Sequence, residues 1–416
     1  MMSALDHTLT ARLQPIASVR AHGMPRGTRL ALEMLDRLEG GAVAIELPGG
    51  AHVRAGQGAL LAHLRIHDHA VFDEVLARGD IGFAETWMNG QWDSIDLASL
   101  LALLAGNRRV LEAAIHGRVL RLIGHRLLHL LRANTRAGSR RNIQAHYDLG
   151  NDFYALWLDP TMTYSAAVFA QPGEALETAQ RRKYRRILEQ LGVRPGQRIL
   201  EIGCGWGGFA EIAATEFGCH VRGLTLSPAQ LSYARARAER GGYADRADFV
   251  LCDYRDEQGR FDHIVSIEMI EAVGERFWPV YFGQLSARLK PGGRCAVQAI
   301  TIADQRFARY RKGTDFIQRY IFPGGMLPSP AVVKQQATAA GLAIDQDFAF
   351  GADYARTLAH WRQRFEAQYQ AVRTLGFDAR FIRMWRFYLA YCEAGFRSGD
   401  VDVHHYLLSH ADGGHR

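Results

Sequence analysis

The residues best suited to chemistry are three glycines in the stretch LEIGCGWGGFAEIA, residues 200–213. Gly203, Gly205 and Gly208 have the spacing G-x-G-x-x-G. A short apolar run at 198–202 precedes them and a helical pattern follows, so the glycines join a buried strand to a helix. Glycine lets the backbone turn sharply and lets a ligand approach without a Cβ in the way. The pattern predicts a cofactor loop; a glycine turn that only packs a helix on a strand is the alternative.

The carboxylates around this loop indicate which cofactor it binds. A nicotinamide cofactor needs an Asp or Glu about 20 residues further on, but no carboxylate lies between residues 217 and 238, where Thr225 and Gln230 are the polar groups. Glu201 instead precedes the first glycine, and Asp253 follows the third strand. Carboxylates suit a ligand that carries positive charge and no phosphate, so we predict S-adenosylmethionine, with Asp253 near the adenine.

The elements that position these residues alternate between strand and helix from Ala145 onward, which predicts an α/β fold with a parallel sheet. Two late strands complete a seven-stranded, Rossmann-like sheet, and aromatic segments at 303–330 and 354–398 predict a helical cover. The seven predicted strands lie near 198–202, 220–226, 248–253, 261–267, 294–301, 342–350 and 401–410.

A smaller α+β domain is predicted before this sheet, at residues 1–135, with the sheet domain at 136–416. Residues 30–38 have a helical pattern, and residues 40–56 read as a hairpin that turns at Pro48-Gly49-Gly50. Nothing in this part has catalytic spacing. We expect it to present lipid or to contact a partner.

The net charge of +7 is unevenly distributed. Residues 113–147 contain seven arginines and no Asp or Glu, interleaved with Leu, Ile and Val. This composition predicts a basic amphipathic helix on an anionic membrane surface; a domain-connecting helix with solvated arginines is the alternative. Because no aromatic residues are interleaved with the arginines, we do not expect nucleic-acid binding.

The cysteines and the hydropathy bear on the compartment. Five scattered cysteines without metal-ligand spacing favour a reducing compartment and no metal site. No apolar run reaches 18 residues, and the first 15 residues lack the apolar core of a secretory signal. We therefore expect a cytoplasmic protein. The arginine-rich stretch adds the expectation that it associates peripherally with the inner face of the cell membrane. We also expect a homo-oligomer.

Seven ordered motifs together resemble the cyclopropane-fatty-acyl-phospholipid synthase family, including its mycolic-acid relatives. The resemblance runs from about His146 to the C-terminus. It implies a methyltransferase fold and, as substrate, the double bond of an unsaturated acyl chain in a membrane phospholipid, with a cyclopropane as product. The motifs are HYDLGNDFYALWLDPTMTYS, LTLSPAQ, DYRD, VSIEMIEAVG, QRYIFPGGMLPS, GADYARTL and YCEAGFRSGD.

The resemblance also implies the residues that bind S-adenosylmethionine. Tyr164 and Ser165 are expected against its methionine part, and the glycine loop beneath it. The expected set is Tyr164, Ser165, Glu201, Gly203, Gly205, Gly207, Thr225, Leu226, Gln230, Asp253 and Tyr254.

The implied catalytic residues are Glu271, Tyr354, Gln298 and Cys392. Methyl transfer to an alkene leaves a carbocation, which aromatic faces stabilise by about 1–2 kcal/mol each when desolvated; Tyr320, Phe322 and Tyr354 are candidates. A base must then remove a proton, and in the family a bound bicarbonate is given this role.

The sequence departs from the family at that anion site. Ala166, Ala272 and Gln298 stand where the family commonly has Cys, His and His. A weaker anion site leaves open an alternative product: relatives that make methylene- or methyl-branched fatty acids, some beside a flavin reductase. A non-catalytic lipid-binding module is the alternative from another class.

Overall fold

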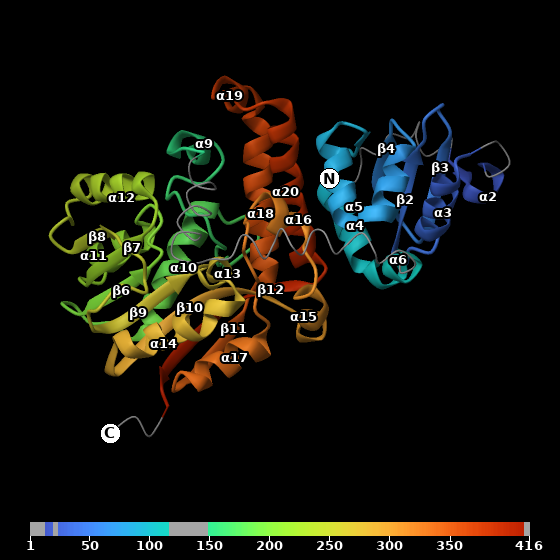
Figure 1. Cartoon of the computed structure of the whole chain (residues 1–416). Coiled ribbons are helices and arrows are strands. Elements are labelled where there is room, and N and C mark those ends of the chain that lie inside the picture. Colours follow the sequence, from blue (N-terminus) through green and yellow to red (C-terminus); the bar gives the residue numbers. More distant parts are fainter. Residues whose placement is uncertain (1–12, 20–23, 116–148, 412–416) are drawn as a thin grey trace. The chain divides into compact units, whose positions relative to one another are not determined.

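The computed structural model describes residues 13–19, 24–115 and 149–411 (Figure 1). The chain forms two compact units, which are described separately. One unit comprises Met1–Leu127 and Tyr369–Ser398, and the other comprises Leu128–Gln368 and Gly399–Arg416. The predicted boundary at residues 135/136 and the arginine-rich stretch lie outside the described residues, so both stay predictions.

The first unit has a five-stranded sheet in the order β1-β3-β2-β4-β5. Strands β2 and β3 pair antiparallel, which confirms the predicted hairpin, and β2 pairs with β4 in parallel. The strands are β1 (Gln14–Pro15), β2 (Gly41–Glu46), β3 (His52–Gln57), β4 (Leu60–Ile66) and β5 (Trp92–Asp93).

Helices from two distant parts of the sequence complete this unit. Helix α20 belongs here and not with the sheet domain, an assignment that the sequence reading did not make. The Trp87 indole donates to the Arg383 carbonyl at 2.8 Å, and the Arg383 guanidinium lies 4.0 Å above the Trp87 ring. The helices are α2 (Ile16–Val19), α3 (Arg26–Leu35), α4 (Ala70–Met88), α5 (Leu97–Gly106), α6 (Arg108–Ile115), α19 (Tyr369–Thr374) and α20 (Ala379–Arg397).

The second unit contains the predicted seven-stranded sheet, in the order β11-β12-β10-β9-β6-β7-β8 (Figure 1). The five strands from β10 to β8 in this order run parallel, and β12 is antiparallel to both β10 and β11. The strands are β6 (Arg198–Ile202), β7 (His220–Thr225), β8 (Ala247–Leu251), β9 (Phe261–Ile267), β10 (Leu289–Ile302), β11 (Leu342–Ala349) and β12 (Val401–His410).

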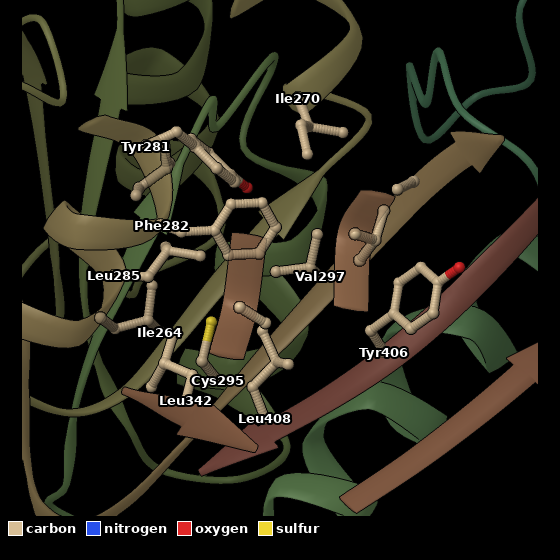
Figure 2. Close-up of a cluster of buried hydrophobic side chains, with 14 of the residues drawn as sticks. Ile264, Ile270, Tyr281, Phe282, Leu285, Cys295, Val297, Leu342, Tyr406 and Leu408 are labelled. Carbon is tan, nitrogen blue, oxygen red and sulfur yellow. The ribbon is translucent and has the colours of Figure 1, made fainter. Parts of the chain in front are cut away.

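Side chains alternate between two cores, one on each face of this sheet. Leu200 and Ile202 join a cluster with helices α14 and α17, whereas Ile199 joins a cluster with α10, α11 and α12. Figure 2 shows the first cluster, where Phe282 and Leu285 pack on Val297. The helices are α9 (Asn151–Ala155), α10 (Leu176–Leu191), α11 (Gly208–Thr215), α12 (Pro228–Arg240), α13 (Ile270–Val273), η2 (Glu275–Phe277), α14 (Trp278–Arg288), α15 (Asp304–Tyr310), α16 (Phe316–Tyr320), α17 (Pro330–Ala339) and α18 (Gly351–Ala367).

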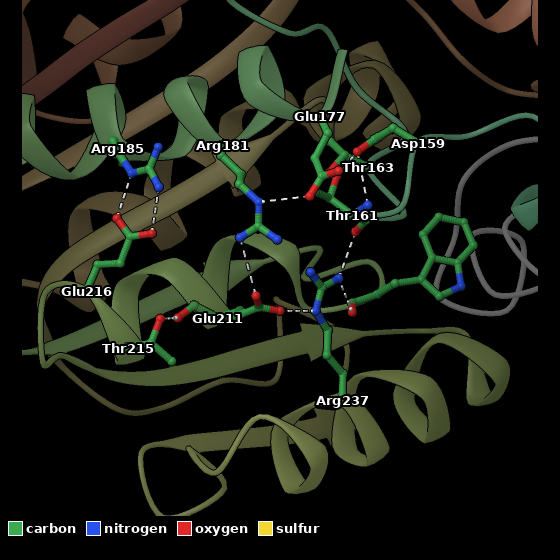
Figure 3. A network of polar contacts seen from close by, with 11 residues as sticks. Asp159, Thr161, Thr163, Glu177, Arg181, Arg185, Glu211, Thr215, Glu216 and Arg237 are labelled. Atoms are coloured by element: carbon green, nitrogen blue, oxygen red, sulfur yellow. Dashed lines mark hydrogen bonds and ion pairs between the residues drawn. The ribbon is translucent and has the colours of Figure 1, made fainter. Parts of the chain in front are cut away.

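A polar network anchors the segment that leads into Tyr164 (Figure 3). The Arg237 guanidinium donates to the Thr161 carbonyl at 2.7 Å and pairs with Glu211 on α11. Thr161 in turn contacts the hydroxyl of Thr163 at 2.7 Å. Because these groups are buried or nearly so, the network fixes residues 159–163 against the sheet domain.

No helix among the described residues is both long and apolar enough to cross a membrane.

Candidate functional site

The glycine loop follows β6 and turns with positive backbone φ angles. The amides of Gly203 and Cys204 both donate to the Leu224 carbonyl, at 3.0 and 2.8 Å. At Gly203 (φ +82°) a Cβ would lie 2.3 Å from the Met269 sulfur, so only glycine fits there. At Gly205 (φ +51°) a Cβ would meet no protein atom within 4 Å. Protein atoms therefore pack against the loop at Gly203, whereas the space beside Gly205 is free of atoms of the described residues. Gly207 is the N-cap residue of α11.

The ends of β7 and β8 carry the other predicted contacts. The Thr225 hydroxyl donates to the Gln230 side chain at 2.8 Å, and Leu226 follows directly. The Asp253 carboxylate accepts from the Arg255 guanidinium, with Nε at 2.8 Å. The sequence did not predict this ion pair, in which Oδ1 also accepts from the Arg255 amide at 3.0 Å and Oδ2 accepts from Nη2 of Arg255 at 2.5 Å. The carboxyl ends of these parallel strands lie at one edge of the sheet, where α/β folds bind ligands.

Two buried polar atoms at this edge lack a partner among the described residues. They are Oε2 of Glu201 and the hydroxyl of Tyr254. Desolvation raises the pKa of the Glu201 carboxyl well above its usual value, and Lys183 and Arg237 oppose that shift. A buried carboxylate oxygen without a donor is costly, so a cationic, hydrogen-bonding ligand would satisfy it. S-adenosylmethionine fits this set.

Tyr164 and Ser165 lie between α10 and an aromatic cluster. The Tyr164 ring centroid is 5.3 Å from that of Trp157 and 5.4 Å from that of Trp361. Lys183 donates to the Ser165 hydroxyl, which leaves the hydroxyl hydrogen available for a ligand.

Two residues of α10 that sequence reasoning missed hold Ser165. Gln180 donates to the Ser165 carbonyl at 2.8 Å, and both Gln180 and Lys183 are fully buried. Desolvation lowers the pKa of Lys183 to about 7. The sequence could have predicted that both side chains are buried, since they lie at helical spacing on the face that also carries Leu176 and Ile187.

A carboxylate outside the predicted set joins two of the predicted catalytic residues, Gln298 and Tyr354. Glu268 directly follows β9, and its Oε1 accepts from the Ala166 amide at 2.8 Å and from Nε2 of Gln298 at 2.7 Å. Its Oε2 accepts from the Tyr354 hydroxyl at 2.7 Å. Glu268 has φ +51°, an uncommon conformation for a non-glycine residue that costs roughly 1–2 kcal/mol. Such strain often marks a functional position.

The electrostatics of Glu268 reflect these contacts. Desolvation raises the pKa of the Glu268 carboxyl, while the hydrogen bonds from Tyr354, Ala166 and Gln298 and the charge of Lys183 oppose the rise. Three donors stabilise the ionised form. The net rise makes this carboxyl more basic than an exposed one.

The four predicted catalytic residues are distributed over both units. Tyr354 and Gln298 meet at Glu268, as described above. Glu271 lies one helical turn on, and its Oε1 accepts from the Ile300 amide, while its Oε2 is buried without a partner among the described residues. Cys392 lies on α20, in the first unit. The catalytic roles of Glu271 and Cys392 remain predictions.

Glu268 could have been found by the argument that selected Asp253. Both are carboxylates within two residues of the end of a parallel strand, at the edge where ligands bind. The motif VSIEMIEAVG contains both carboxylates, and its resemblance to the family implies a role only for Glu271, three residues after Glu268.

Glu271 should make stability fall as the pH rises. Desolvation first, and then Glu268, raises its pKa from 4.5 to about 8. Between these values the unfolded chain releases the proton while the folded protein keeps it, so the free energy of unfolding decreases with increasing pH. Glu271→Gln has no proton to lose, and its stability should decrease less between pH 5 and pH 8. Urea unfolding at both pH values measures the difference; parallel pH dependence in the two proteins would contradict this assignment.

Comparisons with known proteins show the family of the chain. Residues 134–406 match the family model described as mycolic acid cyclopropane synthetase. The chain is 45% identical over 339 residues to the tuberculostearic acid methyltransferase UfaA1 of Mycobacterium tuberculosis, covering 79% of each protein. It is 35% identical over 366 residues to the cyclopropane-fatty-acyl-phospholipid synthase of Escherichia coli, covering 86% of this chain and 91% of that protein.

Solved structures give the same assignment. The mycolic acid cyclopropane synthase CmaA1, in complex with S-adenosylhomocysteine (SAH) and CTAB, is 31% identical, with a TM-score of 0.61 over 65% of this chain and 97% of that one. The fold, the glycine loop and these matches agree, and the chain belongs to the mycolic acid cyclopropane synthetase family of S-adenosylmethionine-dependent methyltransferases.

Proposed function

We propose that the protein methylates the double bond of an unsaturated acyl chain in a membrane phospholipid and that Glu268 removes the departing proton, giving a methylene-branched chain. The observation that carries this proposal is the Glu268 carboxylate, held by the Ala166 amide, Gln298 and Tyr354. The cofactor, when bound, supplies an electrophilic methyl group.

The proposed reaction balances with one base. A carbon–carbon bond forms between the alkene and the methyl group as the sulfur–methyl bond breaks, which leaves a cation on the neighbouring chain carbon. A hydride shift moves the cation to the carbon that bears the methyl group. Glu268 then takes a proton from that methyl group, and the electron pair of the broken C–H bond forms the methylene double bond. General bases placed in this way accelerate a reaction by about 10²–10⁴-fold.

Aromatic side chains lie on one side of this base, and we propose that they keep water from the cation. The Tyr354 side chain is buried, and its ring centroid lies 6.1 Å from that of Trp361. Trp361 also contacts Tyr164, which is expected against the cofactor. An alkene is a weak nucleophile, so it must be held close to the methyl group in a dry pocket. The aromatic cluster supports such a pocket.

We propose that Glu268 takes the place of the bicarbonate expected from the family. The donors that would hold a free anion, Gln298 and Tyr354, already bind the Glu268 carboxylate. A second anion in contact with a carboxylate is disfavoured by charge repulsion. In this proposal bicarbonate is not required.

The branched product is proposed over the cyclopropane because of this altered base and because of the relatives. The 45% identical relative is named a methyltransferase, whereas the 35% identical one is named a cyclopropane synthase. Reduction of a methylene branch to a methyl branch needs a separate reductant, for which a flavin reductase is the proposed partner.

Incubation with unsaturated phospholipid vesicles and S-adenosylmethionine carrying a ¹³C-methyl group tests the proposal. The methylene chain and the cyclopropane are isomers of equal mass, so proton and carbon NMR of the released fatty acids must separate them. We expect label in an exocyclic methylene carbon with vinylic protons. Label in a cyclopropane ring would refute the branched product. Saturated phospholipid vesicles are the control and should take up no label.

A further inference from the structure

Gln298, which donates to the proposed base Glu268, is itself contacted by a buried histidine. His405 on β12 is the register partner of Gln298 on β10. Its Nε2 lies 2.9 Å from Oε1 of Gln298, and the two side chains are only 3% and 1% exposed. The contacts thus run in a line from His405 through the Gln298 amide to Glu268.

The hydrogen positions along this line follow from its two ends. The Glu268 carboxylate can only accept, so Gln298 turns its NH₂ group toward it and its oxygen toward His405. An amide oxygen also only accepts, so His405 must carry its proton on Nε2. Nδ1 of His405 is buried without a partner among the described residues, which fits a neutral ring.

The charged surroundings also keep His405 neutral. Desolvation lowers the pKa of His405 well below its usual value, and Lys183 and Arg186 on α10 and His404 on β12 act in the same direction. The titratable groups that face Glu268 are Tyr354 on α18, Lys183 on α10 and Glu271 on α13. His405 therefore acts as a fixed hydrogen-bond donor.

We propose that His405 is a positioning residue, which holds the Gln298 amide in the orientation that donates to Glu268. The inference rests on the proposed role of Glu268 as the base. Without the His405 donor, the buried Gln298 oxygen loses its partner and the amide is free to rotate. A rotated amide would turn its oxygen toward the carboxylate, so Glu268 would lose one of its donors. Since that hydrogen bond favours the ionised form, Glu268 would stay protonated to a higher pH.

Two substitutions at His405 test the role of its donor. His405→Met is apolar and flexible and removes the N–H, whereas His405→Gln keeps an N–H donor. We expect His405→Met to move the acidic limb of the kcat profile to higher pH by about one unit, which is a rate loss of roughly tenfold below that limb. His405→Gln should restore most of the parent profile. S-adenosylmethionine affinity, measured by calorimetry, should stay within about twofold in both variants.

His404→Gln is the matched control, since His404 is the next residue on β12 and contacts Asp347 at 2.6 Å instead of the site. It should leave the pH profile unchanged. A parent-like acidic limb in folded His405→Met would overturn the inference. If His405→Met does not fold, Gln298→Ala is the reference, because it removes the amide donor to Glu268 altogether. An acidic limb of His405→Gln that is shifted as far as that of Gln298→Ala would also overturn the inference. A Glu268→Gln variant with parent activity would refute the proposed base itself, so the two failures are distinguishable.

Discussion

Replacing Glu268 with Gln is expected to reduce the rate of product formation by about 10²–10⁴-fold, the usual contribution of a general base. Gln is nearly isosteric and faces the same strain at φ +51°, so the change in charge and basicity dominates. The amide cannot take up the proton from the new methyl group. Cofactor affinity should change by less than about fivefold, because Glu268 lies outside the glycine loop. Initial rates of labelled methyl incorporation and calorimetry give the two numbers.

A surface carboxylate serves as the control for this substitution. Glu275 in η2 pairs with Arg311 at 2.6 Å and lies outside the Glu268 contacts. Glu275→Gln should keep the parent rate. If Glu268→Gln retained more than about a tenth of the parent rate, the proton would have another acceptor and the assignment of the base would be wrong.

Gly205→Val is expected to weaken S-adenosylmethionine binding at least about a hundredfold. The new side chain would project into space that no protein atom fills, at the open side of the loop where the cofactor is expected. A valine at φ +51° is also strained by roughly 1–2 kcal/mol. Calorimetric titration of the folded variant measures the affinity.

Gly192→Val separates the effect of the side chain from that of backbone strain. Gly192 caps α10 with φ +67°, and a Cβ there also meets no protein atom within 4 Å. It lies outside the glycine loop, so this variant should lose a comparable amount of stability and keep its cofactor affinity. Equal affinity in Gly205→Val and the parent would show that the cofactor does not approach the loop at Gly205.

The strands of the seven-stranded sheet could be predicted from the sequence, because each is marked by its own run of apolar residues. Residues 198–202, 261–267 and 401–410 coincide with β6, β9 and β12, since apolar runs between turn residues mark buried strands. The glycine loop was likewise predictable, because its backbone conformations need glycine at fixed positions. The antiparallel hairpin of β2 and β3 followed from Pro-Gly-Gly at its turn.

Other features depend on contacts between distant residues, which carry no local signal. Lys183 and Ser165 are 18 residues apart, and Glu268 and Tyr354 are 86 apart, so their hydrogen bonds depend on the tertiary fold. The aromatic segment 354–398 was predicted as helical cover of the sheet domain; it is helical, but its helix α20 belongs to the first unit. The aromatic pattern could not show which of two cores buries this helix, because an apolar face packs equally well on either.

The most direct test of the built-in base measures the response to bicarbonate. Parent protein and Glu268→Gly are assayed in buffer freed of carbon dioxide, with and without added bicarbonate, since glycine accepts φ +51° and leaves room for an anion between Gln298 and Tyr354. We predict that the parent rate does not change with bicarbonate and that Glu268→Gly is nearly inactive until bicarbonate is added. A parent protein that needs bicarbonate, or Glu268→Gly at the parent rate without it, would contradict the account.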